Sequence, residues 1–294
     1  MNKITAALLA LCLLAGPVLF GQDSSAAVQV EDAAAGASRK EQRMAPYVSR
    51  FFKDEAEMWT SPFHLDLKSV LVAGSVLATT ALLVANDEGI YTNIKSYQGR
   101  NPWVDKVSPV VTLLGDWGVD CGIAGLFFLG GVIARDEKAR DTGLMAWETL
   151  VHTGFLVQVA KHLAGRQRPS VDGGRDHWSG PSAFFKRYSE DNFSSYDSFF
   201  SGHTVSAWGL ATVIAENYKN HGWVPPVCYG LAALVGLSRL TEDTHWFSDV
   251  FLGAVVGFAV GKMVVRNQRQ RLQFAPALTP GGIGIAFSYE FRIE

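Results

Sequence analysis

Long apolar runs separated by polar segments, the longest at residues 166–199, dominate the chain between residues 65 and 265. Each run has the length of a helix that is buried or embedded in a membrane, whereas strands are usually shorter. The pattern predicts an all-α fold, a helical bundle of about six core helices. The apolar runs lie at residues 65–86, 105–118, 119–134, 143–165, 201–218, 223–240 and 245–265.

The N-terminal residues have a different character. Residues 1–21 carry Lys3 followed by an apolar stretch, and they predict a signal peptide or an uncleaved N-terminal anchor. In either case we expect the protein to leave the cytoplasm. Residues 22–64 predict a loose linker followed by an amphipathic segment that mixes aromatic and charged residues.

The C-terminal residues are first basic and then alternate between polar and apolar. Basic residues from Lys262 to Arg271 end the bundle, and residues 266–294 are expected to form a basic tail and a hairpin. The alternation on both sides of a Pro-Gly-Gly turn at residues 280–282 predicts this short C-terminal β-hairpin.

Composition narrows the class of partner. Hydrophobic residues make up 48% of the 294 residues and charged residues 18%, and the formal net charge is −2. A weakly negative chain gives no reason to expect a nucleic-acid partner. A mean hydropathy of +0.11 is modest for a protein made wholly of membrane spans. Membrane association is expected, and both an integral and a peripheral protein remain open.

Candidate chemistry is concentrated in residues 238–249, which read SRLTEDTHWFSD. His245 and Asp249 lie four residues apart at the start of an apolar run, so they share one face of a helix. A carboxylate there can hold one imidazole nitrogen and leave the other free to react. Arg239 carries a forked, permanent charge that suits a phosphate group. The alternative is an ordinary polar loop between two helices.

Two further segments offer related chemistry at helix ends. Lys161 and Arg168 lie seven residues apart, nearly on one helix face, so both can reach a single anion. Ser201 is a natural N-cap for the next helix, and the N–H groups exposed beside Gly202 favour phosphate. His203, in the first turn, can give a proton to a leaving oxygen. Each segment alone is also compatible with an ordinary helix terminus.

These helix ends are expected to meet. In an up-and-down bundle they fall on the same side, so one end of the bundle becomes the expected active site. An anion at that end would be surrounded by the cations of Lys161, Arg168 and Arg239. The imidazoles of His203 and His245 would lie on either side of it.

The three segments, in this order and spacing, resemble the type 2 phosphatidic acid phosphatase superfamily, whose pattern is KxxxxxxRP, PSGH and SRxxxxxHxxxD. One position departs from the pattern: Phe200 stands where the family usually has proline, at a site that shapes the turn and carries no chemistry. The resemblance covers residues 65–265, the expected phosphatase bundle. It implies a phosphatase that forms a phosphohistidine intermediate and needs neither a cofactor nor a metal.

The resemblance also implies a role for each residue of the motifs. His245 corresponds to the nucleophile, Asp249 to its orienting partner and His203 to the general acid. The implied phosphate ligands are Lys161, Arg168, Ser201, Gly202 and Arg239.

The substrate stays open at this stage. An apolar bundle with a site at its end suits a lipid phosphate or a lipid pyrophosphate. A soluble periplasmic phosphomonoester is the second reading. A vanadate-dependent haloperoxidase is a third, because vanadate mimics the pentacoordinate state of phosphorus, although such relatives are typically longer chains.

Charged residues away from these segments bear on location and on metals. Basic clusters at residues 135–140 and 262–271 would face the cytoplasm under the positive-inside rule, which puts the site in the periplasm of a bacterial envelope.

Glu148 and His152 lie four residues apart and could bind a metal. The sequence offers no third ligand nearby, which favours a pairing inside the bundle.

Overall fold

A computed structural model describes residues 51–60, 66–171, 176–183, 195–272, 274–279 and 282–287. The chain divides into two units, Met1–Phe51 and Phe52–Glu294, and the second holds nearly all of the described residues. The expected signal peptide or anchor lies outside the described residues, as does the expected linker up to residue 50.

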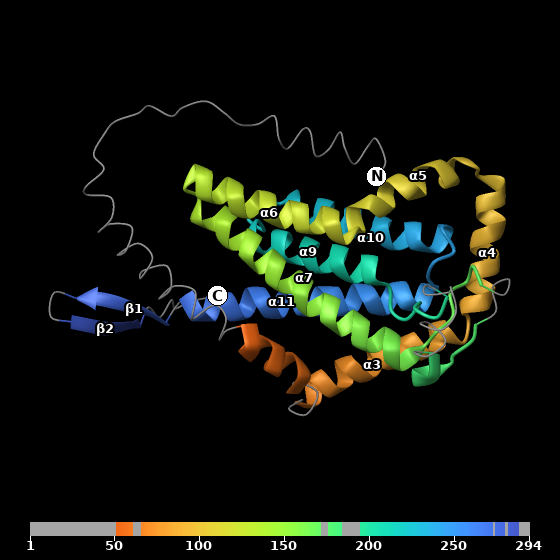
Figure 1. The fold of residues 1–294 in the computed structure, drawn as a ribbon, viewed down its shortest axis with the longest axis horizontal. Coiled ribbons are helices and arrows are strands. Elements are labelled where there is room, and N and C mark those ends of the chain that lie inside the picture. Colours follow the sequence, from red (N-terminus) through yellow and green to blue (C-terminus); the bar gives the residue numbers. More distant parts are fainter. Residues whose placement is uncertain are drawn as a thin grey trace. The chain divides into compact units, whose positions relative to one another are not determined.

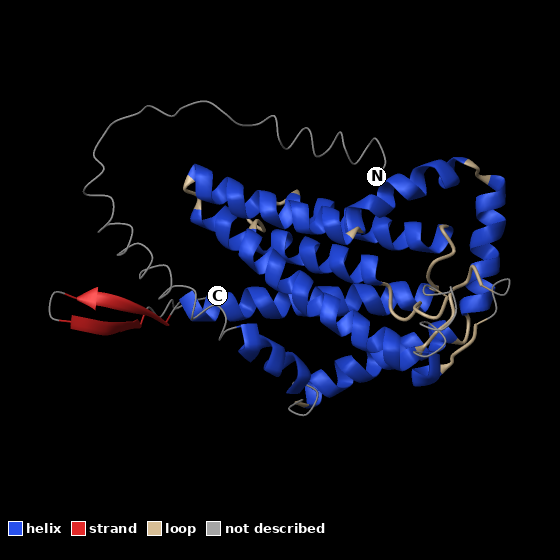
Figure 2. Ribbon diagram, in the orientation of Figure 1, coloured by secondary structure: helices blue, strands red, loops and turns tan. Residues whose placement is uncertain are grey.

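The second unit is mostly helical, which confirms the predicted fold class at that level (Figures 1 and 2). A core of six helices stays a prediction. Residues 51–60 form the first described helix. The later helices are α3 (Leu67–Val84), α4 (Asp87–Arg100), α5 (Trp103–Thr112), α6 (Trp117–Ala134), α7 (Glu137–Ala164), α9 (Gly202–Asn217), α10 (Val224–Thr241) and α11 (Phe247–Leu272), with 3₁₀ turns η2 (Leu113–Gly115) and η3 (Gly180–Ser182).

Helix α9 is the centre of the packing. It contacts α7, α10 and α11, and these helices run side by side in Figure 1. Leu150 of α7, Leu210 and Val213 of α9 and Val264 of α11 are buried in one cluster. Burial of each such side chain contributes about 1.5–3 kcal/mol, so this cluster is a main source of stability.

Two helix crossings are too close for any side chain. A Cβ added at Gly257 of α11 would lie 2.3 Å from the carbonyl oxygen of Val205 on α9. One added at Gly143 of α7 would lie 2.4 Å from the backbone nitrogen of Phe128 on α6. Small residues let the backbones of neighbouring helices touch, so these glycines hold α7 and α11 against their partners.

Several helix boundaries differ from the sequence pattern. The break between the apolar runs at 119–134 and 143–165 is shorter in the structure. Helix α7 already begins at Glu137, because Asp136 caps it by accepting a hydrogen bond from Ala139 N at 3.1 Å. Helix α11 continues to Leu272, so the start of the expected basic tail is helical. The apolar run expected at residues 105–118 is divided between α5, which contains Pro109, and the 3₁₀ turn η2.

Two strands follow the last helix. β1 (Phe274–Thr279) and β2 (Gly282–Phe287) pair antiparallel, with Phe274 opposite Phe287. The turn at residues 280–281 lies outside the described residues, so the hairpin stays a prediction.

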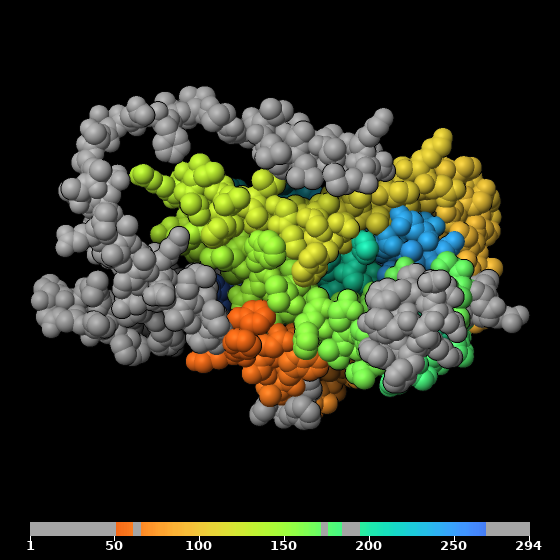
Figure 3. All heavy atoms as spheres, in the orientation of Figure 1, coloured from red at the N-terminus to blue at the C-terminus, as the bar shows by residue number. Residues whose placement is uncertain are grey.

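Four helices among the described residues are long and apolar enough to cross a membrane: α3, α6, α10 and α11. Helix α3 buries only Thr80, and its side chains form part of the surface in orange in Figure 3. Apolar exposure on this scale is typical of a lipid-facing surface. Its most exposed large hydrophobic side chains, each at least 64% accessible, are Leu67, Leu71, Leu77 and Leu82.

Candidate active site

Loops gather at the end of the bundle that α4 crosses (Figure 2). Here α7 ends at Ala164, α9 begins at Gly202, α10 ends at Thr241 and α11 begins at Phe247. Helix α7 ends because Gly165 adopts φ 53°, a left-handed conformation that favours glycine. These ends carry the motif residues.

His245 is buried and held by the backbone. Its Nδ1 lies 2.7 Å from the carbonyl oxygen of Ser198. A carbonyl oxygen only accepts, so Nδ1 carries the proton and the lone pair on Nε2 is available. Burial, followed by the charges of Arg168, Lys161 and Arg239, holds the pKa of His245 well below its ordinary value. The imidazole is therefore neutral, as a nucleophile must be.

Asp249 acts on His245 through an intermediate group. Its Oδ2 lies 3.9 Å from His245 Nδ1, too far for the direct hydrogen bond that the spacing predicted. Instead Oδ2 accepts from Ser198 Oγ at 2.6 Å and from the backbone nitrogen of Trp246 at 2.9 Å. The carboxylate thus fixes Ser198, and the carbonyl of Ser198 fixes the imidazole.

Arg166, which no motif position marks, is the partner of that carboxylate. Its Nη1 donates to Asp249 Oδ1 at 2.7 Å, and its Nη2 donates to Asp87 at 2.8 Å and to Asp176 at 2.7 Å. The arginine is completely buried. Burial alone would lower the pKa of Arg166, but Asp249, Asp176 and Asp87 outweigh it and raise the pKa.

Two aromatic rings enclose the same guanidinium. Its central carbon lies 4.6 Å from the ring centre of Trp178 and 5.2 Å from that of Trp246. Such cation–π contacts favour the charged group where water is excluded. The contacts of Arg166 therefore link α4, α11 and the loop that follows α7.

Asp197 links two of the predicted phosphate ligands. Arg168 Nε donates to Asp197 Oδ1 at 2.7 Å, and Lys161 Nζ lies 3.4 Å from Oδ2. Burial would raise the pKa of Asp197, but the charges of Lys161 and Arg168 outweigh it and lower the pKa. Sequence analysis missed Asp197, since a single carboxylate in a long polar loop carries no distinguishing pattern.

Hydrogen bonds from Nη1 orient the guanidinium group of Arg239. Its Nη1 donates to Glu242 Oε2 at 2.7 Å and to Thr112 Oγ1 at 2.9 Å. Its Nε is buried and finds no hydrogen-bond partner within the described ranges. A buried donor of this kind is costly, so an anion that accepted from it would be favoured.

Ser201 caps α9 as predicted. Its Oγ accepts from the backbone nitrogen of Thr204, and Thr204 Oγ1 donates to it at 2.9 Å. A Cβ added at Gly202 would lie 4.0 Å from Lys161 Nζ, so the start of α9 closely approaches this ammonium group. Phe200, which stands where the family pattern has proline, is buried in an apolar cluster with Val157 and Val205.

His203 lines a cavity of about 260 Å³. Burial, then the charge of Arg239, lowers its pKa to about 4. Asp197 contacts both Lys161 and Arg168, and the carbonyl of the neighbouring Ser198 contacts His245. Gly202, next to His203, lies close to Lys161, so these residues of the three motif segments are near one another. Other residues that line the cavity include Asp116, Trp117, Thr153, Lys161, Gly202 and Ser206.

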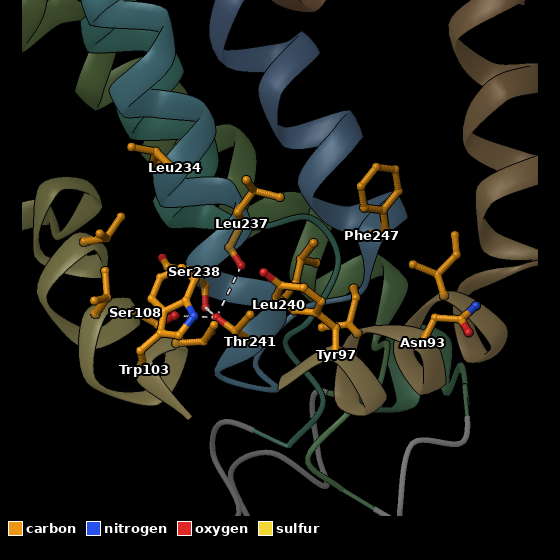
Figure 4. Close-up of a pocket in the computed structure, with 15 residues that line it drawn as sticks. Asn93, Tyr97, Trp103, Ser108, Leu234, Leu237, Ser238, Leu240, Thr241 and Phe247 are labelled. Carbon is orange, nitrogen blue, oxygen red and sulfur yellow. Dashed lines mark hydrogen bonds between the residues drawn. The ribbon is translucent and has the colours of Figure 1, made fainter. Parts of the chain in front are cut away.

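A second, apolar cavity has a volume of about 600 Å³. Figure 4 shows its side chains projecting from α4, α5, α10 and the start of α11. Ser238 lies on its wall, and Ser238 Oγ is 2.7 Å from Thr112 Oγ1, which accepts from Arg239. Two hydrogen bonds, between Ser238 and Thr112 and between Thr112 and Arg239, therefore connect the wall of this cavity to a predicted phosphate ligand. Apolar lining residues include Ile90, Ile94, Val107, Val111, Leu234 and Leu237.

Comparison with known sequences identifies relatives of this region. Residues 143–273 match the PAP2 superfamily model. The chain is 32% identical over 111 residues to lipid A 1-phosphatase of Porphyromonas gingivalis, and this match covers 37% of the chain and 20% of the relative. It is 25% identical over 174 residues to a probable diacylglycerol pyrophosphate phosphatase 1 of Schizosaccharomyces pombe, and this match covers 50% of the chain and 62% of the relative. These matches thus span less than two thirds of either relative.

An acid phosphatase of Zymomonas mobilis is 24% identical over 207 residues, covering 67% of this chain and 69% of that one. Among solved structures, the first transmembrane PAP2 type phosphatidylglycerolphosphate phosphatase from Bacillus subtilis has a similar fold. The TM-score is 0.51 at 21% identity, and the match covers 67% of this chain and 95% of that one.

Proposed function

We propose that the chain, whose residues 143–273 match the PAP2 superfamily model, is a phosphatase that transfers the phosphoryl group of its substrate to His245 and then to water. The observation that carries this proposal is the hydrogen bond of 2.7 Å from His245 Nδ1 to the Ser198 carbonyl. It leaves Nε2 unprotonated in a centre that contains three cationic side chains.

In the first step, Nε2 of His245 attacks phosphorus and the bond from phosphorus to the leaving oxygen breaks. His203 supplies the proton that the leaving oxygen takes up. In the second step, water gives a proton back to His203 and attacks phosphorus. The bond between phosphorus and Nε2 then breaks, and inorganic phosphate leaves with His245 restored.

Side chains supply the positive charge that this reaction requires. Negative charge spreads over the equatorial oxygens of the transferred group, so fixed donors around it lower the barrier. In our proposal Lys161, Arg168 and Arg239 are these donors, with Ser201 and the backbone nitrogen of Gly202 beside them. Asp197 and Glu242 hold the cations in place.

We propose a lipid phosphate or lipid pyrophosphate as the substrate class, with a hydrocarbon chain in the cavity of about 600 Å³. A pocket of this size with apolar walls is suited to such a chain, and its polar edge leads to Arg239. The exposed apolar surface of α3 supports an integral membrane protein. The site would then face the periplasm, with residues 65–265 as the phosphatase bundle.

A soluble phosphomonoester is the second candidate. Similarity to a protein named acid phosphatase favours it. The apolar cavity separates the two candidates, since a small soluble phosphate would leave it empty.

The test is phosphate release from matched substrates by purified wild type, His245→Ala and Val107→Trp. We expect His245→Ala to abolish turnover of every substrate. Val107→Trp, which fills the apolar cavity, should raise KM for a long-chain lipid phosphate and leave p-nitrophenyl phosphate hydrolysis unchanged. Wild-type turnover by His245→Ala would refute the mechanism. Equal effects of Val107→Trp on both substrates would refute the lipid site alone.

A further inference from the structure

Three potential metal ligands meet far from the motif segments in sequence. Asp54 lies on the helix at residues 51–60, while Glu148 and His152 lie one turn apart on α7. Each offers one ligand atom, and these atoms all lie within 4.8 Å of one another. From the sequence, only the pair on α7 could be recognised. The fold adds the carboxylate of Asp54, which lies 94 positions before Glu148. It also brings Glu55, which lies 97 positions before His152, into contact with that histidine.

The histidine of this group is held in the way that metal-bound histidines are held. Its Nδ1 forms a close contact with Glu55 Oε2, and Glu55 is itself fixed by a hydrogen bond of 2.9 Å from Trp59 Nε1. The other ring nitrogen, Nε2, lies 3.7 Å from Glu148 Oε1. A carboxylate on one nitrogen fixes the tautomer and directs the lone pair of the other nitrogen toward an ion.

The carboxylates lie close enough together for one cation to stabilise them. Asp54 is 1% exposed and His152 is completely buried, while the side chains of Glu55 and Glu148 are each 19% exposed. Buried carboxylates that face one another are costly unless a cation or a proton compensates them. The partial exposure of both glutamates leaves a route by which a hydrated ion can enter.

We propose that Asp54, Glu148 and His152 bind one divalent transition-metal ion, with Glu55 orienting the histidine. Two carboxylates and an imidazole suit Zn²⁺ or Mn²⁺. Water would complete the coordination.

The site would fasten the first described helix to the bundle. Asp54 also accepts a hydrogen bond of 3.0 Å from Asn267 Nδ2, so the ion would connect this helix to α7 directly and to α11 through Asn267. Its function is structural and separate from phosphoryl transfer, which uses His203 and His245. Loss of the ion should therefore leave the chemistry at His203 and His245 in place.

The test uses full-length protein without a histidine tag, purified in detergent and stripped with a chelator. Zn²⁺ or Mn²⁺ is added, unbound ion is removed by gel filtration, and bound metal is measured by mass spectrometry together with the unfolding temperature. We expect one equivalent per chain and a higher unfolding temperature. Asp54→Asn and Glu148→Gln should each weaken binding at least tenfold. Glu137→Gln, an exposed carboxylate on the same helix, is the matched control and should bind like wild type.

Equal metal binding by wild type, Asp54→Asn and Glu148→Gln would overturn the proposal, as would failure of the wild type to retain an equivalent. If the variants do not fold, electron paramagnetic resonance of Mn²⁺ bound to wild type decides. Coupling to one imidazole nitrogen supports the site, and its absence overturns it.

Discussion

Arg166 Nη1 lies 2.7 Å from Asp249 Oδ1, and neither side chain is accessible to solvent. Asp249 in turn accepts from Ser198 Oγ, and the carbonyl of Ser198 accepts from His245. The orientation of the reactive imidazole thus depends on an arginine that it does not touch.

Arg166→Ala should destabilise the fold by about 3–5 kcal/mol, because it leaves buried carboxylates without their cation. Arg166→Lys should lose less, since it keeps the charge but not the forked geometry. Denaturant unfolding in detergent, followed by near-UV circular dichroism, measures both. Lys262→Ala, which breaks a partly exposed pair with Glu216, is the control and should cost about 0–1 kcal/mol. Equal losses for Arg166→Ala and Lys262→Ala would contradict this assignment.

Asp249→Asn should reduce kcat by about 10²-fold, the scale expected when a reacting group is displaced by about 1 Å. The amide keeps the shape of the side chain but weakens its bonds to Ser198 and Arg166. KM should change little, because Asp249 binds no phosphate in our account. Steady-state kinetics on one phosphate ester give both constants, and unchanged kcat in a folded variant would remove Asp249 from the mechanism.

Asp197→Asn should strengthen inhibition by inorganic phosphate several-fold and lower kcat. The substitution removes a negative charge next to Lys161 and Arg168, which favours an anion there, but it also releases the two side chains from their fixed positions. Asp141→Asn, on α7, removes the same charge from a carboxylate that pairs with Arg140 and should change neither quantity. Weaker phosphate inhibition in Asp197→Asn would show that positioning outweighs charge.

The pKa of His203 should rise when phosphate binds. Burial and the charge of Arg239 lower this pKa to about 4. An anion neutralises that charge, so the protonated imidazole becomes more favourable and can act as an acid at higher pH. Titration of ¹⁵N-labelled histidines by NMR, with and without phosphate, measures the shift. The exposed His221 is an internal control, and a His203 signal that ignores phosphate would argue against its proximity to the anion.

Sequence reasoning succeeded where the information is local. The end of α7 at Gly165 and the cap of α9 at Ser201 follow from glycine and serine chemistry within a few residues. Because successive helices run in opposite directions, the end of α7 with Lys161 and the start of α9 with His203 line one cavity, and His245 is held by the loop that also contacts Lys161.

Sequence reasoning failed where a contact joins distant segments. Arg166 and Asp87 lie 79 positions apart, and His152 and Glu55 lie 97 apart. No periodicity or spacing links such residues, because only the packing of whole helices decides which polar groups meet. The prediction of a direct hydrogen bond between Asp249 and His245 was wrong for a related reason. Ser198, which belongs to a loop distant in sequence, lies between them and bonds to both.

The central claim is that His245 becomes phosphorylated. Wild type mixed briefly with a phosphate substrate and quenched in alkali should gain the mass of one phosphoryl group. Peptide mapping should locate it on His245, and acid should remove it. His245→Ala should gain no such mass under the same conditions. A wild type that turns over substrate rapidly but never carries the group on His245, at any quench time, would contradict the account.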